Sequence, residues 1–204
     1  MDKNNFFVHE SSYIDESVEI EEGTKIWHFC HILKNTIIGK NCTIGQGCSI
    51  GPNVKIGNNV KIQNNNNIPD GLTLEDNVFI GPLIGFTNVK TPRSHWSRRE
   101  EYKKTLVKEG GSIGANAVVI CGITLGKYCL IGAGSLVTKN VPDYCLVYGN
   151  PASIGGWVCY CGIKLNFNDA GNAKCSLCER EYIKHELEVK MVKDGKYKDG
   201  RSLS

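Results

Sequence analysis

Aliphatic or aromatic residues recur at every sixth position over much of this chain, with mostly polar residues and glycine between them. The first series runs through Val8, Ile14, Ile20, Ile26, Ile32, Ile38, Ile44, Ile50, Ile56, Ile62, Ile68, Leu74, Ile80 and Phe86. A second series in a shifted frame runs through Val107, Ile113, Val119, Leu125, Ile131 and Val137. A period of six fits neither the 3.6-residue turn of an α-helix nor the alternation of a strand, so it predicts a repeating coil.

Each six-residue unit is expected to form a short strand followed by a corner. The aliphatic residue points inward, a glycine often follows it, and a small or β-branched residue takes the fifth place. Asparagine and glycine are frequent between the strands because a corner often needs a positive φ, which both tolerate. Three units, or 18 residues, would close a triangular turn, so that residues 18 apart stack at about 4.8 Å, the spacing of neighbouring strands. The sequence therefore predicts an all-β parallel solenoid with internal columns such as Ile26, Ile44, Ile62 and Ile80.

The repeat fails in two places, and these divide the chain into regions. Twenty-one residues separate Phe86 from Val107, three more than one full turn, so we expect the register to slip there. Long excursions from a regular scaffold are more often functional than decorative. Beyond about residue 156 the period is gone. We expect a solenoid over residues 1–156 with a loop at about 87–104, an appendage over 157–183, and a charged tail over 184–204 that is frayed or helical at best.

Composition and charge exclude several classes of protein. The 24 Lys and Arg barely exceed the 21 Asp and Glu and are scattered, so no basic stripe for nucleic acid is present. No run of 18 apolar residues exists and the N-terminus is polar, so we expect a cytoplasmic protein without membrane insertion. Cys30, Cys42, Cys48 and Cys129 occupy the small fifth place, where a reduced thiol packs as a small hydrophobe.

A second set of cysteines has a spacing of its own. Cys159 and Cys161 precede Cys175 and Cys178 by a short loop, which resembles a zinc ribbon. In such a ribbon four thiolates hold Zn²⁺ tetrahedrally and replace a missing core. The first pair departs from the usual C-x₂-C spacing, so free thiols in a weakly ordered segment are the alternative to a structural zinc. A catalytic zinc is not expected, because four thiolates leave no open position.

Several segments resemble one family of enzymes. Trp27-His28-Phe29-Cys30-His31 resembles the Trp-His-Phe-x-His segment of bacterial sugar N-acetyltransferases, and Phe86-Thr87-Asn88-Val89 resembles the entry to their active-site loop. Gly149-Asn150-Pro151-Ala152 is similar to the Gly-x-Pro-Ala exit of the same family. Over roughly residues 8–156 the chain thus resembles the hexapeptide-repeat acyltransferases. This resemblance implies a left-handed parallel β-helix, a homotrimer, and acetyl-CoA as co-substrate.

The resemblance also implies a reaction. The subgroup that is most similar acetylates the 3-amino group of a UDP-linked 2-acetamido-3-amino-2,3-dideoxy-glucuronic acid, which feeds lipopolysaccharide and other surface polysaccharides. An alternative substrate is a dTDP-linked 3-amino-deoxyhexose, which lacks the carboxylate. From other classes, a hexapeptide-repeat carbonic anhydrase would need metal-binding histidines that converge between subunits, and the five histidines match that pattern poorly. A non-catalytic scaffold is disfavoured by the loop and the exit segment.

Acyl transfer to an amine needs a neutral amine beside the thioester carbon and a donor for the developing oxyanion. On the resemblance, Asn88 is the catalytic residue: it accepts a hydrogen bond from the sugar amine, and the coenzyme A thiolate later takes the proton. His28 and His31 are expected to face outward, where they are candidates for contact with the substrate or for a general base. For His28 the alternative is a polar outer ladder with Gln46 and Asn64 in its column. The column of His31 holds Ser49, Asn67 and Gly85, small or polar residues that leave space beside the imidazole.

The remaining candidates follow from chemistry or from the family's layout. Arginines bind carboxylate or pyrophosphate bidentately, aromatic rings stack on a nucleobase, and amides bind hydroxyl or carboxylate groups. The substrate-binding candidates are therefore Asn64, Asn65, Arg93, Arg98, Arg99, Trp96 and Tyr102. In the resembling family coenzyme A lies between two subunits near the last turns, which implicates the backbone amides of Gly114, Gly132, Ala133 and Gly134, and Lys127 and Lys139 for the phosphates. Stacked corner asparagines and ordinary surface charge are the alternatives.

Overall fold

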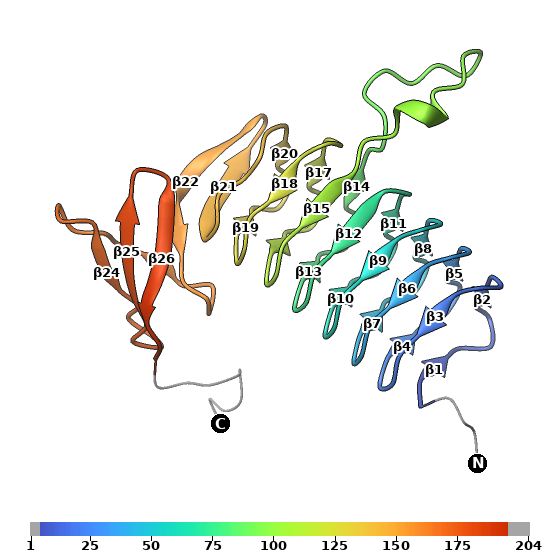
Figure 1. The fold of residues 1–204 in the computed structure, drawn as a ribbon, viewed down its shortest axis with the longest axis horizontal. Coiled ribbons are helices and arrows are strands. Elements are labelled where there is room, and N and C mark those ends of the chain that lie inside the picture. The colour runs from blue at the N-terminus through green and yellow to red at the C-terminus, as the bar shows by residue number, and fades with distance from the viewer. Residues whose placement is uncertain (1–4, 196–204) are drawn as a thin grey trace.

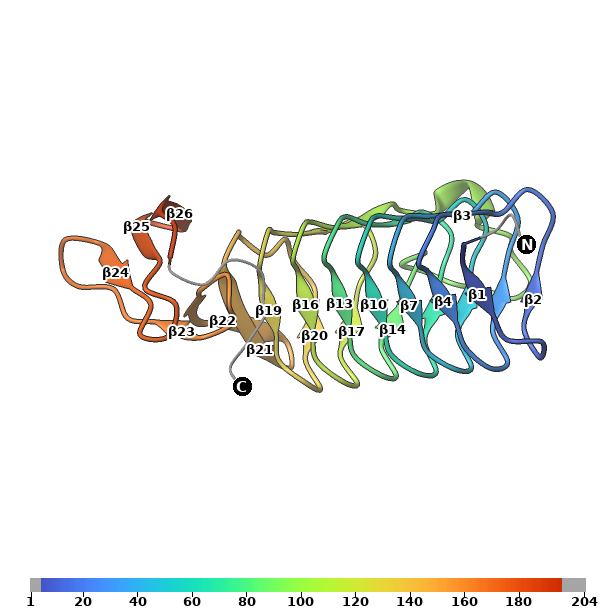
Figure 2. The ribbon, with the colours of Figure 1, turned by 90° about the horizontal axis from the view of Figure 1, so that it is seen from below.

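The computed structural model describes residues 5–195. Most of this chain winds into a three-sided coil of short parallel strands, seen from two directions in Figures 1 and 2. Within the described residues the structure has one helix, the 3₁₀ turn η1 (Arg99–Glu101), and no helix long and apolar enough to cross a membrane. The predicted all-β parallel solenoid is thereby confirmed.

The strands form three sheets, one on each side of the coil, which we call sheets A, B and C. Sheet A contains, in spatial order, β1 (Phe7–Val8), β4 (Lys25–Ile26), β7 (Thr43–Ile44), β10 (Lys61–Ile62), β13 (Phe79–Ile80), β16 (Ser112–Ile113), β19 (Leu130–Ile131), β21 (Cys145–Gly149), β22 (Ala152–Val158) and β23 (Lys164–Leu165). Sheet B contains β2 (Tyr13–Ile14), β5 (His31–Ile32), β8 (Ser49–Ile50), β11 (Asn67–Ile68), β14 (Gly85–Phe86), β17 (Val118–Val119) and β20 (Leu136–Val137). Sheet C contains β18 (Thr124–Leu125), β15 (Thr105–Val107), β12 (Leu72–Leu74), β9 (Lys55–Ile56), β6 (Ile37–Ile38) and β3 (Glu19–Ile20).

The pairing register reproduces the 18-residue turn. Ile44 lies opposite Ile26 on one side and Ile62 on the other, and Ile62 lies opposite Ile80. Three hexads therefore make one coil, and each aliphatic residue stacks on its counterpart one coil away. The left-handed sense remains an expectation from the family resemblance.

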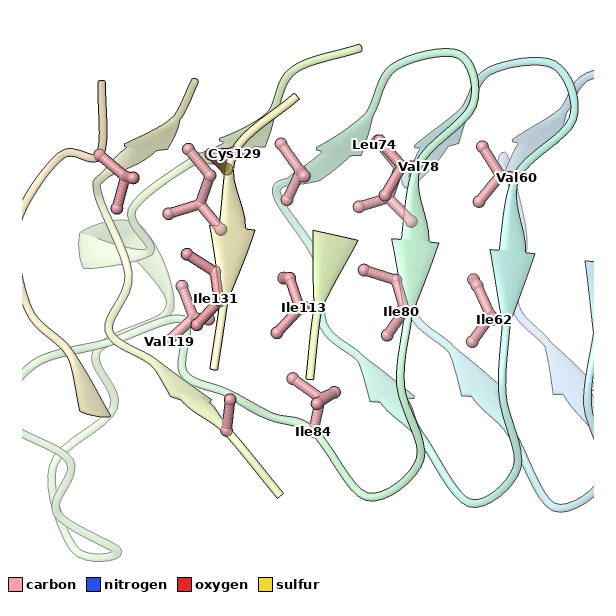
Figure 3. Packing of buried hydrophobic residues seen from close by; sticks show 14 of the residues in the cluster. Val60, Ile62, Leu74, Val78, Ile80, Ile84, Ile113, Val119, Cys129 and Ile131 are labelled. Carbon is pink, nitrogen blue, oxygen red and sulfur yellow. The ribbon is translucent and has the colours of Figure 1, made fainter. Parts of the chain in front are cut away.

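The core is the set of inward-pointing aliphatic residues that the period of six selects. Figure 3 shows Ile62, Ile80, Ile113 and Ile131 following one another along the inside of the coil, and all four are at most 1% exposed. Burying an isoleucine side chain contributes roughly 1.5–3 kcal/mol, so the columns supply the main stabilising term. A corner residue with positive φ such as Asn59 lets the chain turn between sheets, and its side-chain amide donates to the Asn77 side-chain oxygen one coil on at 2.7 Å.

The fifth place of each hexad is a small buried slot, as predicted. Cys30, Cys42, Cys48 and Cys129 are each at most 2% exposed and carry free thiols. Polar residues in the same slot bridge adjacent coils instead. The side-chain amide of Asn66 donates to the Gly81 carbonyl at 2.9 Å, and its side-chain oxygen accepts the Ile84 N–H at 2.8 Å. The buried Asn66 thus has a structural role.

The loop at residues 87–104 is an insertion at a single corner, between β14 of sheet B and β15 of sheet C (Figure 1). Val107 pairs with Leu74, which is 33 residues earlier and therefore 15 more than one coil. The expected slip of three residues is thus wrong as a description. The coil resumes in its old columns once the 15 extra residues have left and returned, because the backbone of Lys103 donates to the Asn88 carbonyl at 2.8 Å and closes the loop at its base.

The C-terminal segment is more ordered than expected. β21 continues sheet A parallel to β19, whereas β22 and β23 extend the sheet by antiparallel pairing. β22 crosses the boundary expected at residue 156. A separate antiparallel sheet follows, formed by β24 (Asn172–Lys174), β25 (Glu181–His185) and β26 (Glu188–Lys193). The expectation of a frayed tail from residue 184 is wrong as far as residue 193, because that stretch forms a hairpin; residues 196–204 lie outside the described residues.

Candidate functional site

The turns between sheets A and B stack into one ridge, which we call corner AB. His28, Asn64 and Asn65 lie on it towards the N-terminal end, and Gly114 and residues 132–134 lie on it towards the C-terminal end. Backbone bonds join its successive levels: Gly47 donates to the His28 carbonyl at 2.9 Å, for example. Corner AB therefore brings these seven candidate positions into one line but spreads them over several coils.

Corner AB does not offer the backbone donors that the family layout implied. The N–H of Gly114 donates to Ile131 and that of Gly132 donates to Val147, each at 2.8 Å. The N–H of Gly134 donates to Ala115, also at 2.8 Å. These three amides serve the ladder between coils, so the prediction that they present N–H groups to the pantetheine arm is wrong. Within the described residues, only Ala133 of the four has an N–H without an acceptor.

The two lysines predicted to meet the phosphates lie on the other two corners. Lys127 follows sheet C, on corner CA, and its Nζ lies 3.2 Å from Glu109 Oε2. Lys139 follows β20, on corner BC. Since each corner faces a different direction, one chain does not bring Lys127, Lys139 and Ala133 together.

His31 faces outward from sheet B and forms a pair that the sequence analysis did not find. Its Nε2 lies 2.7 Å from Asp15 Oδ1, while Asp15 Oδ2 accepts the Lys34 N–H at 3.0 Å. The hydrogen bond from His31 is the main reason why the pKa of Asp15 lies below its ordinary value. Asp15 fixes the orientation of the imidazole and leaves Nδ1 as its outer nitrogen. A spacing of 16 residues, close to one coil, was the available signal.

His28 belongs to a group of exposed aromatic rings on the first two coils. Its ring stacks on His9, with centroids 3.5 Å apart, and lies beside Trp27 and Phe29. Phe7 packs against Trp27 at 5.7 Å. Trp27 and Phe29 are 40% and 71% exposed, so this end of corner AB offers apolar surface for a flat ring. His9 also escaped the sequence analysis, although it precedes His28 by about one coil.

Asn88 lies at the base of the loop on corner BC and is half-buried. Its backbone carbonyl is used to close the loop, which leaves its side chain at the foot of that excursion. His31 is three coils away, because it aligns with Ser49, Asn67 and then Gly85 along sheet B. Three steps of about 4.8 Å separate the two levels by roughly 14 Å. Asn88 and His31 therefore cannot both contact one amine of a substrate bound to this chain.

The loop itself presents its candidates unequally. Arg98 Nη1 forms an ion pair with Glu101 Oε1 at 2.7 Å, and within the described residues its buried Nε has no acceptor. Arg93 donates to the Pro92 carbonyl at 2.8 Å, and Arg99 is exposed in η1. Trp96 is 63% exposed. Arg93, Arg99 and Trp96, together with the exposed Tyr102, therefore form the accessible surface of the loop, whereas Arg98 is largely neutralised by Glu101.

The four cysteines of the appendage converge, as predicted. Their sulfur atoms all lie within 4.8 Å of one another, with Cys159 Sγ 3.3 Å from Cys178 Sγ and Cys161 Sγ 3.6 Å from Cys175 Sγ. Cys161 is exposed and the other three are buried. Tetrahedral zinc with Zn–S bonds of about 2.3 Å requires sulfurs about 3.8 Å apart, so the donor set suits this metal in kind and in spacing.

Two stretches of the solenoid match known repeat signatures. Residues 17–52 match the one described as bacterial transferase hexapeptide (six repeats), and residues 110–139 match the hexapeptide repeat of succinyl-transferase. These two matches lie in the coils on either side of the loop. These stretches of the chain are therefore similar to the hexapeptide repeats of bacterial transferases.

Individual relatives match part of the chain. The dTDP-3-amino-3,6-dideoxy-alpha-D-galactopyranose 3-N-acetyltransferase of Aneurinibacillus thermoaerophilus is 51% identical over 83 residues, 41% of this chain and 42% of that protein. Galactoside O-acetyltransferase of Lactococcus lactis is 34% identical over 98 residues, 47% of this chain and 43% of that protein. The chain thus spans less than half the length of these relatives. A solved structure of perosamine N-acetyltransferase from Caulobacter crescentus, in complex with CoA and GDP-perosamine, is 22% identical with a TM-score of 0.45, and the match covers 73% of this chain and 55% of that one.

Proposed function

We propose that this protein is an N-acetyltransferase that transfers an acetyl group from acetyl-CoA to the amine of a nucleotide-linked amino sugar. The observation that carries the proposal is the 51% identity to a nucleotide-sugar 3-N-acetyltransferase over 83 residues. The resemblance of the loop entry around Asn88 to that of sugar N-acetyltransferases points the same way. A cytoplasmic location and a role in surface polysaccharide synthesis belong to the same proposal.

Between the two sugars, a dTDP-linked 3-amino-deoxyhexose is better supported than the UDP-linked glucuronic acid. The relative that supports it is named for a dTDP-linked 3-amino-3,6-dideoxy sugar. That sugar carries no carboxylate, and the ion pair between Arg98 and Glu101 leaves two of the three candidate arginines, Arg93 and Arg99, to bind a carboxylate. The first interpretation of the sequence, a uronic acid, therefore becomes the alternative.

In the proposed reaction the sugar nitrogen attacks the thioester carbonyl carbon, and the carbon–sulfur bond breaks. Asn88 accepts a hydrogen bond from the amine through its side-chain oxygen and so directs the nitrogen lone pair at the carbonyl. The thiolate of coenzyme A leaves and takes the proton that the nitrogen loses. A sugar amine is less basic than a lysine, so a strong protein base is not required.

His31 is then a substrate-contacting or structural residue and not the base. Its level along the solenoid is roughly 14 Å from that of Gly85, from which the loop departs. A trimer with its axis parallel to the solenoid would keep every coil at the same height, so a second subunit would not bring His31 to Asn88. An extended nucleotide sugar could instead reach both levels at once.

The distribution of the candidate residues supports a homotrimer as part of this proposal. Asn88 and Lys139 lie on corner BC, Ala133 lies on corner AB and Lys127 lies on corner CA. Residues on different corners can line one site only when corners of two chains face each other. We therefore propose that acetyl-CoA binds between neighbouring subunits, with the loop of one chain reaching towards the other.

The proposal is tested by an assay of thiol release from acetyl-CoA with a panel of dTDP- and UDP-linked amino sugars. We expect the highest kcat/KM for a dTDP-linked 3-amino-deoxyhexose. A higher value for the UDP-linked uronic acid would restore the first interpretation, and no thiol release with any amino sugar would overturn the proposed function. A matched sugar with a hydroxyl in place of the 3-amino group is the control for N-acetylation.

Asn88→Ala should lower kcat by about 100-fold, the size typical of losing one group that orients the reacting atoms. Folding should be unaffected, because the loop is closed by the backbone carbonyl of Asn88 and not by its side chain. The control is Asn166→Ala, an exposed asparagine on the appendage. Equal turnover of both variants would remove Asn88 from the mechanism.

His31→Asn tests the absence of a protein base. We expect its kcat to keep the acidic limb of the wild-type pH–rate profile, with any loss appearing in KM, because His31 and Asn88 lie on different levels. Flattening of the acidic limb would instead identify His31 as the general base.

The alternatives from other classes gain no support. Among residues 5–195, the one group of three or more metal-ligating side chains consists of cysteines, and no such group contains histidine. A carbonic anhydrase would have to assemble its histidines entirely between subunits. Retention of acetyl transfer after removal of bound metal would separate the transferase from that alternative.

A further inference from the structure

The appendage is joined to the solenoid by a continuous buried core. Cys159, Cys175, Cys178, Tyr182 and Val189 belong to the same buried cluster as the aliphatic columns of the coil. Across the join, the Val158 N–H donates to the Tyr144 carbonyl at 2.8 Å. The appendage is therefore packed onto the last coil. Figure 1 shows its strands β24, β25 and β26 at the end of the coil formed by β21 and β22.

Tyr182 lies at the centre of this join. It is 1% exposed, and its ring packs edge-on against Tyr144, with centroids 5.4 Å apart. Tyr144 in turn stacks on Tyr128 at 5.4 Å, one level further into the coil on corner CA. Three tyrosines thus form a line that leads from the cysteine cluster into the solenoid.

The hydroxyl of Tyr182 is directed at a sulfur of the cluster. It accepts the Tyr160 N–H at 3.0 Å and lies 3.1 Å from Cys159 Sγ. Because an oxygen lone pair already receives the N–H, the hydroxyl proton is available to point at the sulfur. A hydrogen bond of this kind to a metal-bound thiolate is the usual way in which an outer residue fixes a ligand.

Tyr160 completes the join from the other side. Its ring lies 4.7 Å from that of Tyr128, and the guanidinium of Arg180 lies over it at 4.4 Å. Arg180 is 5% exposed and follows Cys178 by two residues. Both turns that carry cysteines are therefore attached to the same aromatic group.

The end of a solenoid needs such a cover, since the last coil otherwise exposes apolar residues and unpaired strand edges. The appendage is too small to hold its own shape by apolar burial, and a structural metal commonly replaces the missing core in such segments. We propose that the four cysteines bind one Zn²⁺, that the metal-bound appendage caps the C-terminal end of the solenoid, and that Tyr182 is the positioning residue between metal site and coil.

Metal content tests the first part. The full chain purified from zinc-supplemented medium should contain about one zinc per chain, Cys178→Ser should lose it, and Cys121→Ser, a buried thiol outside the cluster, should keep it. A wild-type content below about a tenth of an equivalent, or thiols paired as disulfides, would overturn the site whatever the result of any acetylation assay.

Amide hydrogen exchange tests the cap. Removal of zinc with a chelator should increase exchange in β21 and around Tyr144, and leave β4, β7 and β10 protected as before. Unchanged exchange in β21 after complete zinc loss would show that the appendage does not cap the coil.

Tyr182→Phe tests the positioning role, because the ring stays while the hydroxyl is removed. Competition with a chelator should show zinc affinity lowered by about tenfold, the lower end of what the loss of such a partner costs. Tyr148→Phe, an exposed tyrosine of β21, is the matched control and should bind zinc as the wild type does. Equal affinity in both variants would remove Tyr182 from the site.

Discussion

The two ends of this molecule reach order by different means. In the coils between residues 25 and 80, every level repeats the last, and the stabilising contacts are the same isoleucine-on-isoleucine stack. In the appendage no level repeats, and the contacts are four sulfurs, a line of tyrosines and a hairpin. Repetition also makes the solenoid tolerant of a long insertion, since the chain returns to the columns of the earlier coils after the loop.

The comparison also bears on where function is placed. The coils supply flat, regular corners whose backbone donors are already used within the ladder. Groups available for chemistry therefore come from side chains at irregular positions, such as Asn88 at the base of the loop. The candidate groups lie on different corners of one chain, and for this reason we propose a site between subunits.

The largest expected effect is in the coils. Ile62→Ala removes a side chain that is 1% exposed and stacked on both sides, so the free energy of unfolding should fall by about 2–5 kcal/mol. Chemical denaturation followed by circular dichroism measures this loss. The matched change in the other region is Val189→Ala, a buried residue of the appendage, which should leave the unfolding of the coils nearly unchanged.

An equal loss in coil stability from Val189→Ala would break the comparison, because it would show that the two regions unfold as one. A small loss of unfolding free energy in Ile62→Ala would also contradict the comparison, because the coils would then not depend on each stacked isoleucine. Neighbouring coils would then be compensating for a missing level, as repeat proteins with weakly coupled units do.

The join between the regions has a smaller expected effect. Tyr128 Oη donates to Glu109 Oε1 at 2.7 Å, and burial, followed by this carboxylate, raises the pKa of the tyrosine. Tyr128→Phe keeps the stacked ring and removes the hydrogen bond, and Glu109 retains Lys127 as its partner. We expect the free energy of unfolding to fall by about 1 kcal/mol, the typical net value of one hydrogen bond.

Two measurements on Tyr128→Phe, its free energy of unfolding and its zinc content, together decide which contacts hold the appendage to the solenoid. Loss of about 1 kcal/mol with zinc retained means that the rings, and not this hydroxyl, carry the contact to the appendage. Loss of zinc as well would mean that the hydroxyl of Tyr128 is needed for the geometry of the cap, contrary to our expectation.

The sequence predicted the repeated region well and the irregular ones less well, for a physical reason. A column such as Ile26 over Ile44 follows from a period alone, and so does the small slot that Cys42 fills. The hairpin of β25 and β26 was hidden because charged residues dominate its composition, although Val189 and Met191 alternate as a strand requires. Asp15 beside His31 depends on two side chains meeting across coils, for which the spacing of 16 residues was the one signal in the sequence.

Site features that depend on residue type alone were predicted correctly. Features that depend on which backbone N–H groups are already hydrogen-bonded were missed. Four cysteines at short spacings announce a cluster, and the structure brings their sulfurs together. The N–H of Gly132 cannot be known to be occupied until the strand one level on is in place. Residue types therefore indicated which groups were present, and the register of the coil decided which of them were available.

The smallest expected effect concerns the pair at the N-terminal coils. The pKa of Asp15 is lowered in the folded protein, chiefly by the hydrogen bond from His31, so folding is favoured whenever this carboxyl is ionised. The contribution is complete above the ordinary pKa of 3.8 and is lost as the pH falls through the lowered value. The unfolding midpoint of the wild type should therefore exceed that of Asp15→Asn near neutral pH, and the gap should close below about pH 4.

Because the pair is exposed, the gap should be small and should shrink further in salt. The double variant Asp15→Asn/His31→Asn supplies the control: with His31 already replaced, the change at Asp15 should no longer produce a pH-dependent gap. If Asp15→Asn/His31→Asn still differs from His31→Asn in a pH-dependent way, the effect comes from the hydrogen bond of the Lys34 N–H to Asp15 and not from the histidine. That outcome would also mean that the first coils, like the rest of the repeat, are held by backbone hydrogen bonds and not by this pair of side chains.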